Sequence, residues 1–135
     1  MAIFLLISAV LLGCSHRKKI SKQEVQSELR SVTSLVAETQ TFLGYLRQGR
    51  ATRNFAQAHA TYLENEAKRS AHELGEADPE IGTENALHRC QAQLETLRRE
   101  LTLIRSAIGD DQKLAAIEAQ LQAMRADLEQ AQSSL

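Results

Sequence analysis

Apolar residues recur every three or four positions in the second half of this 135-residue chain, and this spacing constrains the fold more than any other feature. The most regular stretch consists of Leu87, Cys90, Leu94, Leu97, Leu101, Ile104 and Ile108. Alternating steps of three and four are those of the a and d positions of a coiled coil, which lie on one face of a helix. The pattern therefore predicts a long helix that buries this face.

A second run of the same spacing follows Gly109. It consists of Leu114, Ile117, Leu121, Met124 and Leu128. Ile108 and Leu114 are six residues apart, whereas an unbroken heptad frame needs seven. We therefore expect the helix to stop, kink or turn at Gly109.

The first half of the chain shows a similar but less regular organisation. Ser21 and Glu24 have the spacing of a capping box, which predicts a helix start. The apolar seam that follows is formed by Val25, Leu29, Val32, Val36, Leu43 and Leu46, and it continues more weakly to Leu74. Residues 75–82 contain the only proline, Pro79, and predict a connecting loop, after which Thr83 is expected to cap the next helix.

Residues 21–74 and 83–134 thus form two helical arms of nearly equal length, and the expected fold class is all-α. We favour a long antiparallel helical hairpin or coiled coil, because the sequence around Gly49 lacks the polar helix breakers of a loop. The alternative is an up-and-down four-helix bundle. Gly49 and Gly109 are equally far from Pro79 in the sequence, so both arms could fold back at the same level.

Charge and residue types exclude several classes of function. The 16 basic residues nearly cancel the 17 acidic ones, so no basic field predicts nucleic-acid binding. Ser and Thr are scattered over predicted helices rather than over converging loops, and we expect neither an enzyme nor catalytic residues. His59 and Tyr62 share a helix face, but no two histidines have the i, i+4 spacing of a zinc site, so we expect no metal.

The N-terminus carries a separate signal. Residues 1–13 form an apolar run that is too short to cross a hydrocarbon core of about 30 Å, and Cys14 follows it. Leu11, Leu12, Gly13 and Cys14 resemble the cleavage box of bacterial lipoprotein precursors. The resemblance covers only this segment and names a processing route.

This resemblance implies a signal peptide at residues 1–13 and covalent lipid, palmitate included, on Cys14, with no other cofactor. Residues 14–20 would form a lipidated basic tether and residues 21–134 a helical domain. The mature protein would lie in the bacterial cell envelope, anchored to a membrane and facing the periplasm or the exterior.

Two observations leave an alternative open. No basic residue precedes the apolar run, which a natural start upstream of Met1 would explain, and basic residues follow Cys14 almost directly. Basic residues on that side favour a cytoplasmic location. The alternative is therefore a short N-terminal membrane anchor with a cytoplasmic-facing coiled coil. In either case Arg17, Lys18 and Lys19 are candidates for contact with the membrane surface.

An isolated pair of helices would leave the apolar seam half-covered. We therefore expect self-association or a helical protein partner on this seam. The candidate contact residues are Leu87, Leu94, Leu97, Leu101, Ile104 and Ile108.

Cys90 lies in the same seam and has two interpretations. It could form an intermolecular disulfide across a parallel pair of seams, or, as we favour, it fills a d position as a small apolar residue.

Arg47, Arg50 and Arg53 make one helix face basic, with no acidic residue between Glu38 and Glu64. That face meets anionic lipid or an acidic partner, or, as we favour, is only solvated.

These expectations define a lipid-tethered helical protein with a structural or protein-interaction role. One form of that role is an accessory subunit of an envelope machine. A different class, a helical bundle that binds a small ligand, would require a compact four-helix core with a cavity.

Overall fold

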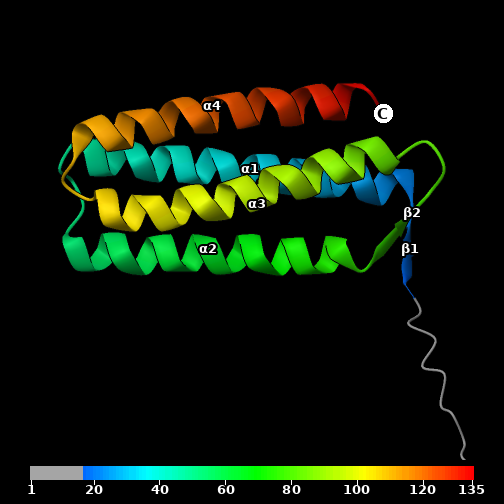
Figure 1. The fold of residues 1–135 in the computed structure, drawn as a ribbon, viewed down its shortest axis with the longest axis horizontal. Coiled ribbons are helices and arrows are strands. Elements are labelled where there is room, and N and C mark those ends of the chain that lie inside the picture. The colour runs from blue at the N-terminus through cyan, green and yellow to red at the C-terminus, as the bar shows by residue number, and fades with distance from the viewer. Residues whose placement is uncertain (1–16) are drawn as a thin grey trace, which may run out of the picture.

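The computed structural model describes residues 17–135 and shows a four-helix bundle (Figure 1). The helices are α1 (Lys22–Arg47), α2 (Arg53–Gly75), α3 (Glu84–Ala107) and α4 (Asp111–Ser133). Two three-residue strands, β1 (Lys18–Ile20) and β2 (Ala77–Pro79), lie at one end of the bundle. The expected all-α class is confirmed, and the architecture is the one held as the alternative, the up-and-down bundle.

The preference for a long extended hairpin was wrong, because both arms fold back on themselves. Gly49 and Gly109 have positive φ angles of 65° and 92°, which glycine adopts at little cost. Each turn is followed by a capped helix: the Thr52 hydroxyl accepts a hydrogen bond from the Phe55 amide at 3.3 Å, and the Asp110 carboxylate accepts one from the Lys113 amide at 3.2 Å. A glycine and a cap are sufficient for a reversal without a long polar loop.

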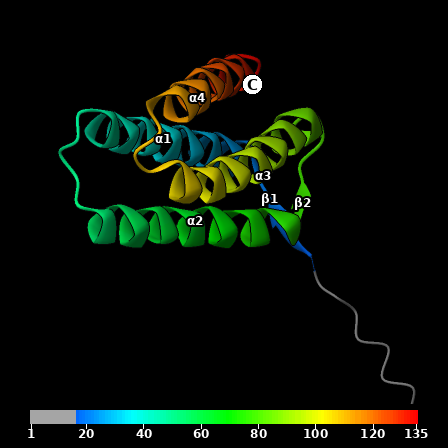
Figure 2. The ribbon, with the colours of Figure 1, turned by 60° about the vertical axis from the view of Figure 1, so that its left-hand side comes forward.

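The pairing of the two arms is nevertheless the one expected for a hairpin. Helix α2 packs mainly on α3, and α1 packs mainly on α4. Helices α2 and α4 lie on opposite sides of the central pair formed by α1 and α3 (Figure 2). The fold is therefore a hairpin bent double at Gly49 and Gly109.

The core consists of the apolar seams of all four helices, whose side chains are almost completely removed from solvent. Leu29, Leu43, Leu63, Leu74, Leu87, Leu94, Leu97, Leu101, Ile104, Leu114, Leu121 and Met124 are its largest fully buried members. Burial of such aliphatic side chains, each favourable by about 1.5–3 kcal/mol, is the main stabilising contribution to the bundle.

Three arginines join neighbouring helices through ion pairs. Arg47 of α1 binds Asp111 and Glu118 of α4, and Arg89 of α3 binds Asp127 of α4. Arg105 of α3 binds Glu64 of α2, with a distance of 2.8 Å between nitrogen and oxygen. Helix α1 is thus tied to α4, and α3 is tied to both α2 and α4.

The strands fix the point at which the chain enters the bundle. β1 and β2 pair in parallel, with Lys18 opposite Ala77 and Ile20 opposite Pro79. The Glu80 amide donates to the Ile20 carbonyl at 3.0 Å, and the Glu80 carboxylate accepts from the Lys22 amide at 2.9 Å. This pairing was not predicted, because two strands of three residues give no sequence period.

N-caps were predicted for the two longest helices, α1 and α3, and the structure confirms the capping hydrogen bonds only for α1. The capping box at Ser21 is confirmed, since the Glu24 amide donates to the Ser21 hydroxyl and the Ser21 amide donates to the Glu24 carboxylate. Thr83 occupies the N-cap position of α3, but its side chain makes no capping hydrogen bond. Its hydroxyl donates instead to the Glu80 carbonyl at 2.7 Å, so it stabilises the preceding turn.

Candidate protein-interaction face

The residues predicted to meet the membrane lie at the strand end of the bundle. Cys14 is outside the described residues. Arg17, Lys18 and Lys19 are exposed, and the Lys18 ammonium lies 3.5 Å from the Glu24 carboxylate. Helices α1 and α3 begin at this end, and α2 and α4 finish there (Figure 1).

The predicted partner seam is corrected by the structure, because it faces the other helices of the same chain. Leu94, Leu97, Leu101 and Ile104 have no exposed area, Leu87 is 2% exposed, and Ile108 is partly buried against the core. Folding both arms in half covers the surface that an extended hairpin would have left open. A partner helix could contact these side chains only if the bundle opened.

The intermolecular disulfide at Cys90 does not fit the folded bundle. Cys90 is 1% exposed, and its burial, together with the nearby Glu28 charge, raises the pKa of the thiol to about 12. Disulfide exchange needs an accessible thiolate. The structure places this residue as a small apolar member of the core.

A cluster of aromatic side chains at the other end of the bundle forms the candidate site. We call it the aromatic face and define it as Phe42 and Tyr45 of α1 with Phe55, His59 and Tyr62 of α2. These residues include every Phe and Tyr in the part of the chain that the structure describes. The α1–α2 turn brings them together, because Phe42 and Phe55 flank the reversal at Gly49.

The rings pack in a defined geometry. His59 stacks on Phe55, with centroids 5.5 Å apart and planes within 8°, and on Tyr62 at 5.8 Å. Phe42 meets His59 edge-on at 4.8 Å and Phe55 edge-on at 6.5 Å. Offset stacking and edge-to-face contacts are the favourable arrangements of aromatic rings, so the cluster is ordered rather than a chance gathering.

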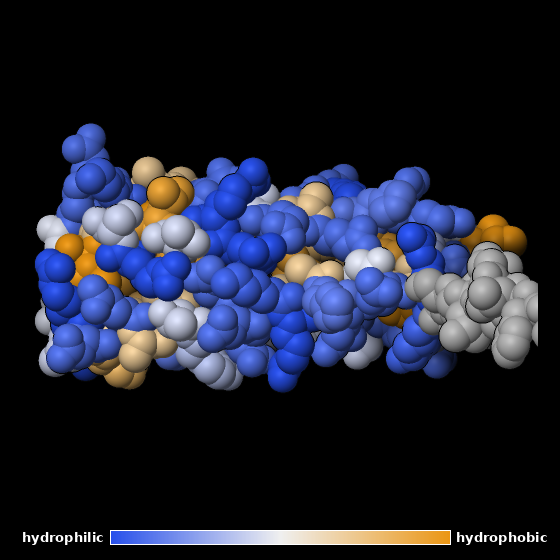
Figure 3. Space-filling view, turned by 60° about the horizontal axis from the view of Figure 1, so that its bottom comes forward, coloured by the Kyte–Doolittle hydropathy of each residue, from blue (hydrophilic) through white to orange (hydrophobic). Residues whose placement is uncertain are grey.

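Three of these rings remain largely in solvent. Tyr45 is 47% exposed, Phe55 is 54% exposed and Tyr62 is 52% exposed, whereas Phe42 is buried beneath them. They surround an apolar groove of about 210 Å³ between α1 and α2, lined by Glu38, Thr41, Phe42, Tyr45, Phe55 and His59. Figure 3 shows apolar surface exposed among hydrophilic side chains at its left-hand end, which in Figure 1 is the end that carries both the α1–α2 and the α3–α4 turns.

Charges of both signs border the aromatic face. The Arg50 guanidinium lies over the Tyr45 ring, 5.5 Å from its centroid, within cation–π range. Arg50 makes no ion pair within residues 17–135, whereas Arg47 is held by Asp111 and Glu118. The one acidic residue that lines the groove is Glu38, whose carboxylate lies 3.7 Å from the His59 imidazole.

Sequence reasoning missed this face although part of its signal was visible. Phe55, His59 and Tyr62 are spaced four and three apart on one helix, which places them on one side of α2. His59 and Tyr62 were considered only as metal ligands. Phe42 and Tyr45 join them through the reversal at Gly49, which the sequence analysis held only as the alternative.

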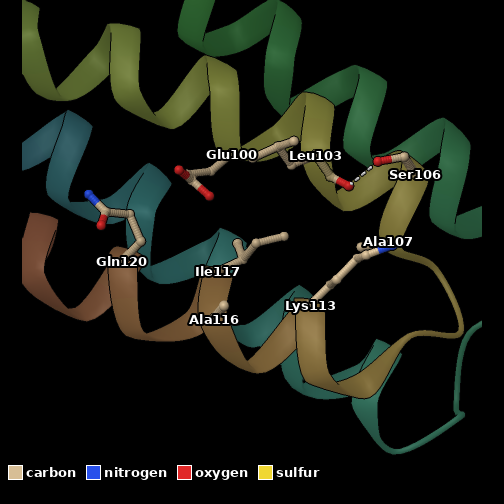
Figure 4. Close-up of a pocket in the computed structure, with 8 residues that line it drawn as sticks. All are labelled: Glu100, Leu103, Ser106, Ala107, Lys113, Ala116, Ile117 and Gln120. Atoms are coloured by element: carbon tan, nitrogen blue, oxygen red, sulfur yellow. Dashed lines mark hydrogen bonds between the residues drawn. The ribbon is translucent and has the colours of Figure 1, made fainter.

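A second surface groove lies between α3 and α4 (Figure 4). Its volume is about 340 Å³, and its apolar lining includes Leu103, 51% exposed, and Ile117, with Glu100, Lys113 and Gln120 around them. Burial raises the pKa of the Glu100 carboxyl. No aromatic ring lines this groove, in contrast to the aromatic face.

Neither a metal centre nor a membrane span is found in residues 17–135. No group of three or more His, Cys, Asp or Glu residues there is arranged to hold a metal ion. None of the helices in this range combines the length and the apolar character that crossing a bilayer requires.

The fold and the face together define a small up-and-down four-helix bundle with an exposed aromatic groove at one end. Comparison with protein-family models, with curated proteins and with solved structures finds no match to this chain. Functional argument therefore depends on the chemistry of its own surface.

Proposed function

We propose that this chain is a lipid-anchored protein of the bacterial cell envelope whose helical bundle serves protein interaction rather than catalysis. The observation that carries the interaction role is the aromatic face at the end of the bundle opposite β1. Phe42 is 20 residues beyond Lys22 on α1, which places it about 30 Å along the helix from the strand end. A tether at the strand end would leave the aromatic face directed away from the membrane.

The composition of the aromatic face supports a protein partner. Tyr, Phe and Arg are enriched at the centres of protein interfaces, where they supply much of the binding energy. Rings that are half exposed, such as Phe55 and Tyr62, contribute less to the core of the monomer than fully buried side chains do. The residues are therefore placed for contact with another molecule.

The lipid anchor in this proposal derives from the resemblance of Leu11, Leu12, Gly13 and Cys14 to a lipoprotein cleavage box. Two or more acyl chains are needed for stable anchoring, and that processing route supplies them. Arg17, Lys18 and Lys19 would lie next to the bilayer and contact its phosphates. The alternative remains a short uncleaved anchor with a cytoplasmic bundle.

Metabolic labelling with an alkyne palmitate tests the anchor. We expect the wild-type chain to be labelled and to sediment with membranes, and the variant Cys14→Ser to lose the label. Cys90→Ser is the matched control, because its thiol is buried in the core and should leave labelling unchanged. An unlabelled wild-type chain that retains residues 1–13 would support the alternative anchor instead.

Site-specific photo-crosslinking in intact cells tests the interaction role. A photoreactive phenylalanine at Tyr62 should give a discrete crosslinked product, because position 62 is half exposed on the aromatic face. The same group at Gln122, exposed on α4, should not give that product. Equal products at both positions would contradict a specific interaction at the aromatic face.

A further inference from the structure

We propose that the groove of the aromatic face binds the guanidinium group of an arginine side chain presented by a partner protein. The guanidinium would stack on the exposed rings and pair with the carboxylate of Glu38. This inference rests on the proposed interaction role and specifies the chemistry of the partner. It is carried by the charge, the lining and the size of the groove.

The charge within the groove is negative. Glu38 is the one acidic residue that lines it, and no lysine or arginine is among the lining residues. The Glu38 side chain is 48% exposed, and the His59 Nε2 atom lies 3.7 Å from its carboxylate, which is longer than a hydrogen bond. The carboxylate can therefore accept hydrogen bonds from an incoming cation, and it would repel an acidic group.

Arg50 leaves this end of the groove unneutralised. Its guanidinium lies over the Tyr45 ring, 5.5 Å from the centroid. Tyr45 and Glu38 are seven residues apart on α1, or about 10 Å along the helix axis. This separation exceeds the Debye length of about 8 Å at physiological ionic strength, so the charge of Arg50 is largely screened at Glu38.

The lining of the groove favours a guanidinium over an ammonium group. Tyr45 and Phe55 contribute rings that are 47% and 54% exposed, and Phe42 lies buried beneath them. A guanidinium is planar and weakly hydrated, so it can stack on an aromatic ring while its N–H groups bind a carboxylate. An ammonium group is strongly hydrated and would lose water to a surface that offers mainly rings. The contact of Arg50 with Tyr45 is an example of such stacking within this chain.

The size of the groove suits one side chain rather than a whole small-molecule ligand. Its volume of about 210 Å³ is below the roughly 300–1,000 Å³ of ligand pockets. Arginine is one of the residues that anchor the centres of protein interfaces. The rest of the partner would lie on the surface around the groove, where Tyr62 is half exposed.

The test uses short synthetic peptides that differ only at the central residue, which is Arg, citrulline, Lys or norleucine. Citrulline has nearly the shape of arginine without its charge, so it is the matched control. Each peptide, and free phosphocholine, is titrated at neutral pH against the full chain in an uncharged maltoside detergent, and the aromatic NMR signals of the chain report binding. We expect the Arg peptide to bind at least about fivefold more tightly than the citrulline and norleucine peptides, and more tightly than the Lys peptide.

Variants of the full chain locate the binding. Glu38→Gln keeps the shape of the groove and should bring the Arg and citrulline peptides to nearly equal affinity. Phe55→Ala should weaken binding of the Arg peptide at least about fivefold. Glu76→Gln removes an exposed carboxylate at the other end of α2 and should change neither affinity. Circular dichroism of each variant checks that the helices are retained, since the substituted side chains are exposed.

Several outcomes would overturn the inference. Equal affinity of the Arg peptide and any of the other three peptides, or a preference for Arg that persists in Glu38→Gln, removes the guanidinium pair with Glu38. Tighter binding of phosphocholine than of the Arg peptide assigns the groove to a quaternary ammonium group instead. A discrete photo-crosslink at Tyr62 without a preference for Arg would reject only this inference, whereas loss of both would also reject the interaction role.

Discussion

Helix α2 has two contact surfaces of different character, one facing α3 and one facing α1. Towards α3, helix α2 presents the buried residues Ala60, Leu63 and Ala67 and the ion pair between Glu64 and Arg105. Towards α1, it presents rings that are half exposed and a single ion pair, Glu38–His59, among the described residues. Small and aliphatic residues allow close helix approach, whereas the aromatic rings of the other seam fill a shallow groove.

Under the proposed interaction role, the difference separates the residues that stabilise the fold from those that would bind a partner. Aliphatic side chains that are fully buried contribute most to folding, and exposed aromatic rings contribute most to binding. Four sets of variants test this difference, in order of decreasing effect on stability.

The largest contrast is between a core leucine and an exposed ring. Leu97→Ala removes a side chain with no exposed area and should lower the free energy of unfolding by about 2–5 kcal/mol. Phe55→Ala removes a side chain that is 54% exposed and should cost about 1 kcal/mol or less. Urea denaturation followed by circular dichroism measures both. A Phe55→Ala cost equal to that of Leu97→Ala would place the aromatic face in the stabilising core.

The ion pair of the tight seam should contribute less than a core leucine and should depend on pH. Hydrogen bonding by Lys68 and the charge of Arg105 lower the pKa of the Glu64 carboxyl. A lowered pKa in the folded state means that the stabilisation is present above the unfolded pKa near 4.5 and is lost as pH falls through the folded value.

Glu64→Gln should therefore reduce stability by about 1–2 kcal/mol at pH 7 and have little effect near pH 2. Urea titrations of both proteins at the two pH values measure the difference. Glu76→Gln is the control, because Glu76 is exposed at the end of α2 and makes no ion pair within residues 17–135, and it should change stability little at either pH. A cost for Glu64→Gln that is the same at both pH values would argue against an electrostatic contribution.

The two turns offer a matched comparison between the seams. Gly49 and Gly109 both have positive φ, and a Cβ added at either would meet no heavy atom within 4 Å. The cost of Gly49→Ala and of Gly109→Ala is therefore backbone strain alone, about 1–2 kcal/mol each. Thermal unfolding of the two variants should give similar decreases in Tm. A Gly49→Ala variant of unchanged stability would indicate that the α1–α2 turn is not needed in this conformation.

The smallest effect is expected where α1 and α2 face each other near the strands. Burial and the nearby Glu73 charge raise the pKa of the Glu28 carboxyl, so its ionised form destabilises this seam. Because the folded pKa is raised, stability is gained as pH falls through it, and removal of the charge is favourable only above it. Glu28→Gln should raise Tm slightly at pH 7 and leave it unchanged at pH 3. Scanning calorimetry at the two pH values checks the sign.

The elements of this fold could be predicted from the sequence, but their arrangement only in part. The seam from Leu87 to Ile104, the capping box at Ser21 and the stop at Gly109 follow from local period and local chemistry, and the structure has all three. Whether the arms fold back depends on the turn at Gly49, where one positive φ and one threonine cap replace the polar loop that was sought.

The candidate site could not be predicted from the sequence, because it too depends on the turn between α1 and α2. The aromatic residues occupy positions 42–62 and become neighbours only after the chain reverses between α1 and α2. The seam of α3, conversely, looked open to a partner because nothing in its own period shows that the same chain covers it. Sequence periods identify which side of a helix is apolar, and tertiary contacts decide what covers it.

The short parallel strand pair also has a mechanical consequence. A load drawn through the chain before Arg17 acts first on the contacts of Lys18–Ile20 with Ala77–Pro79, and α1 is shielded behind them. If these contacts rupture, the three residues of β1, which span roughly 10 Å, are freed from the bundle while the first turn of α1 keeps its cap. Under such a force, β1 would detach from β2 before the helices of the bundle begin to separate.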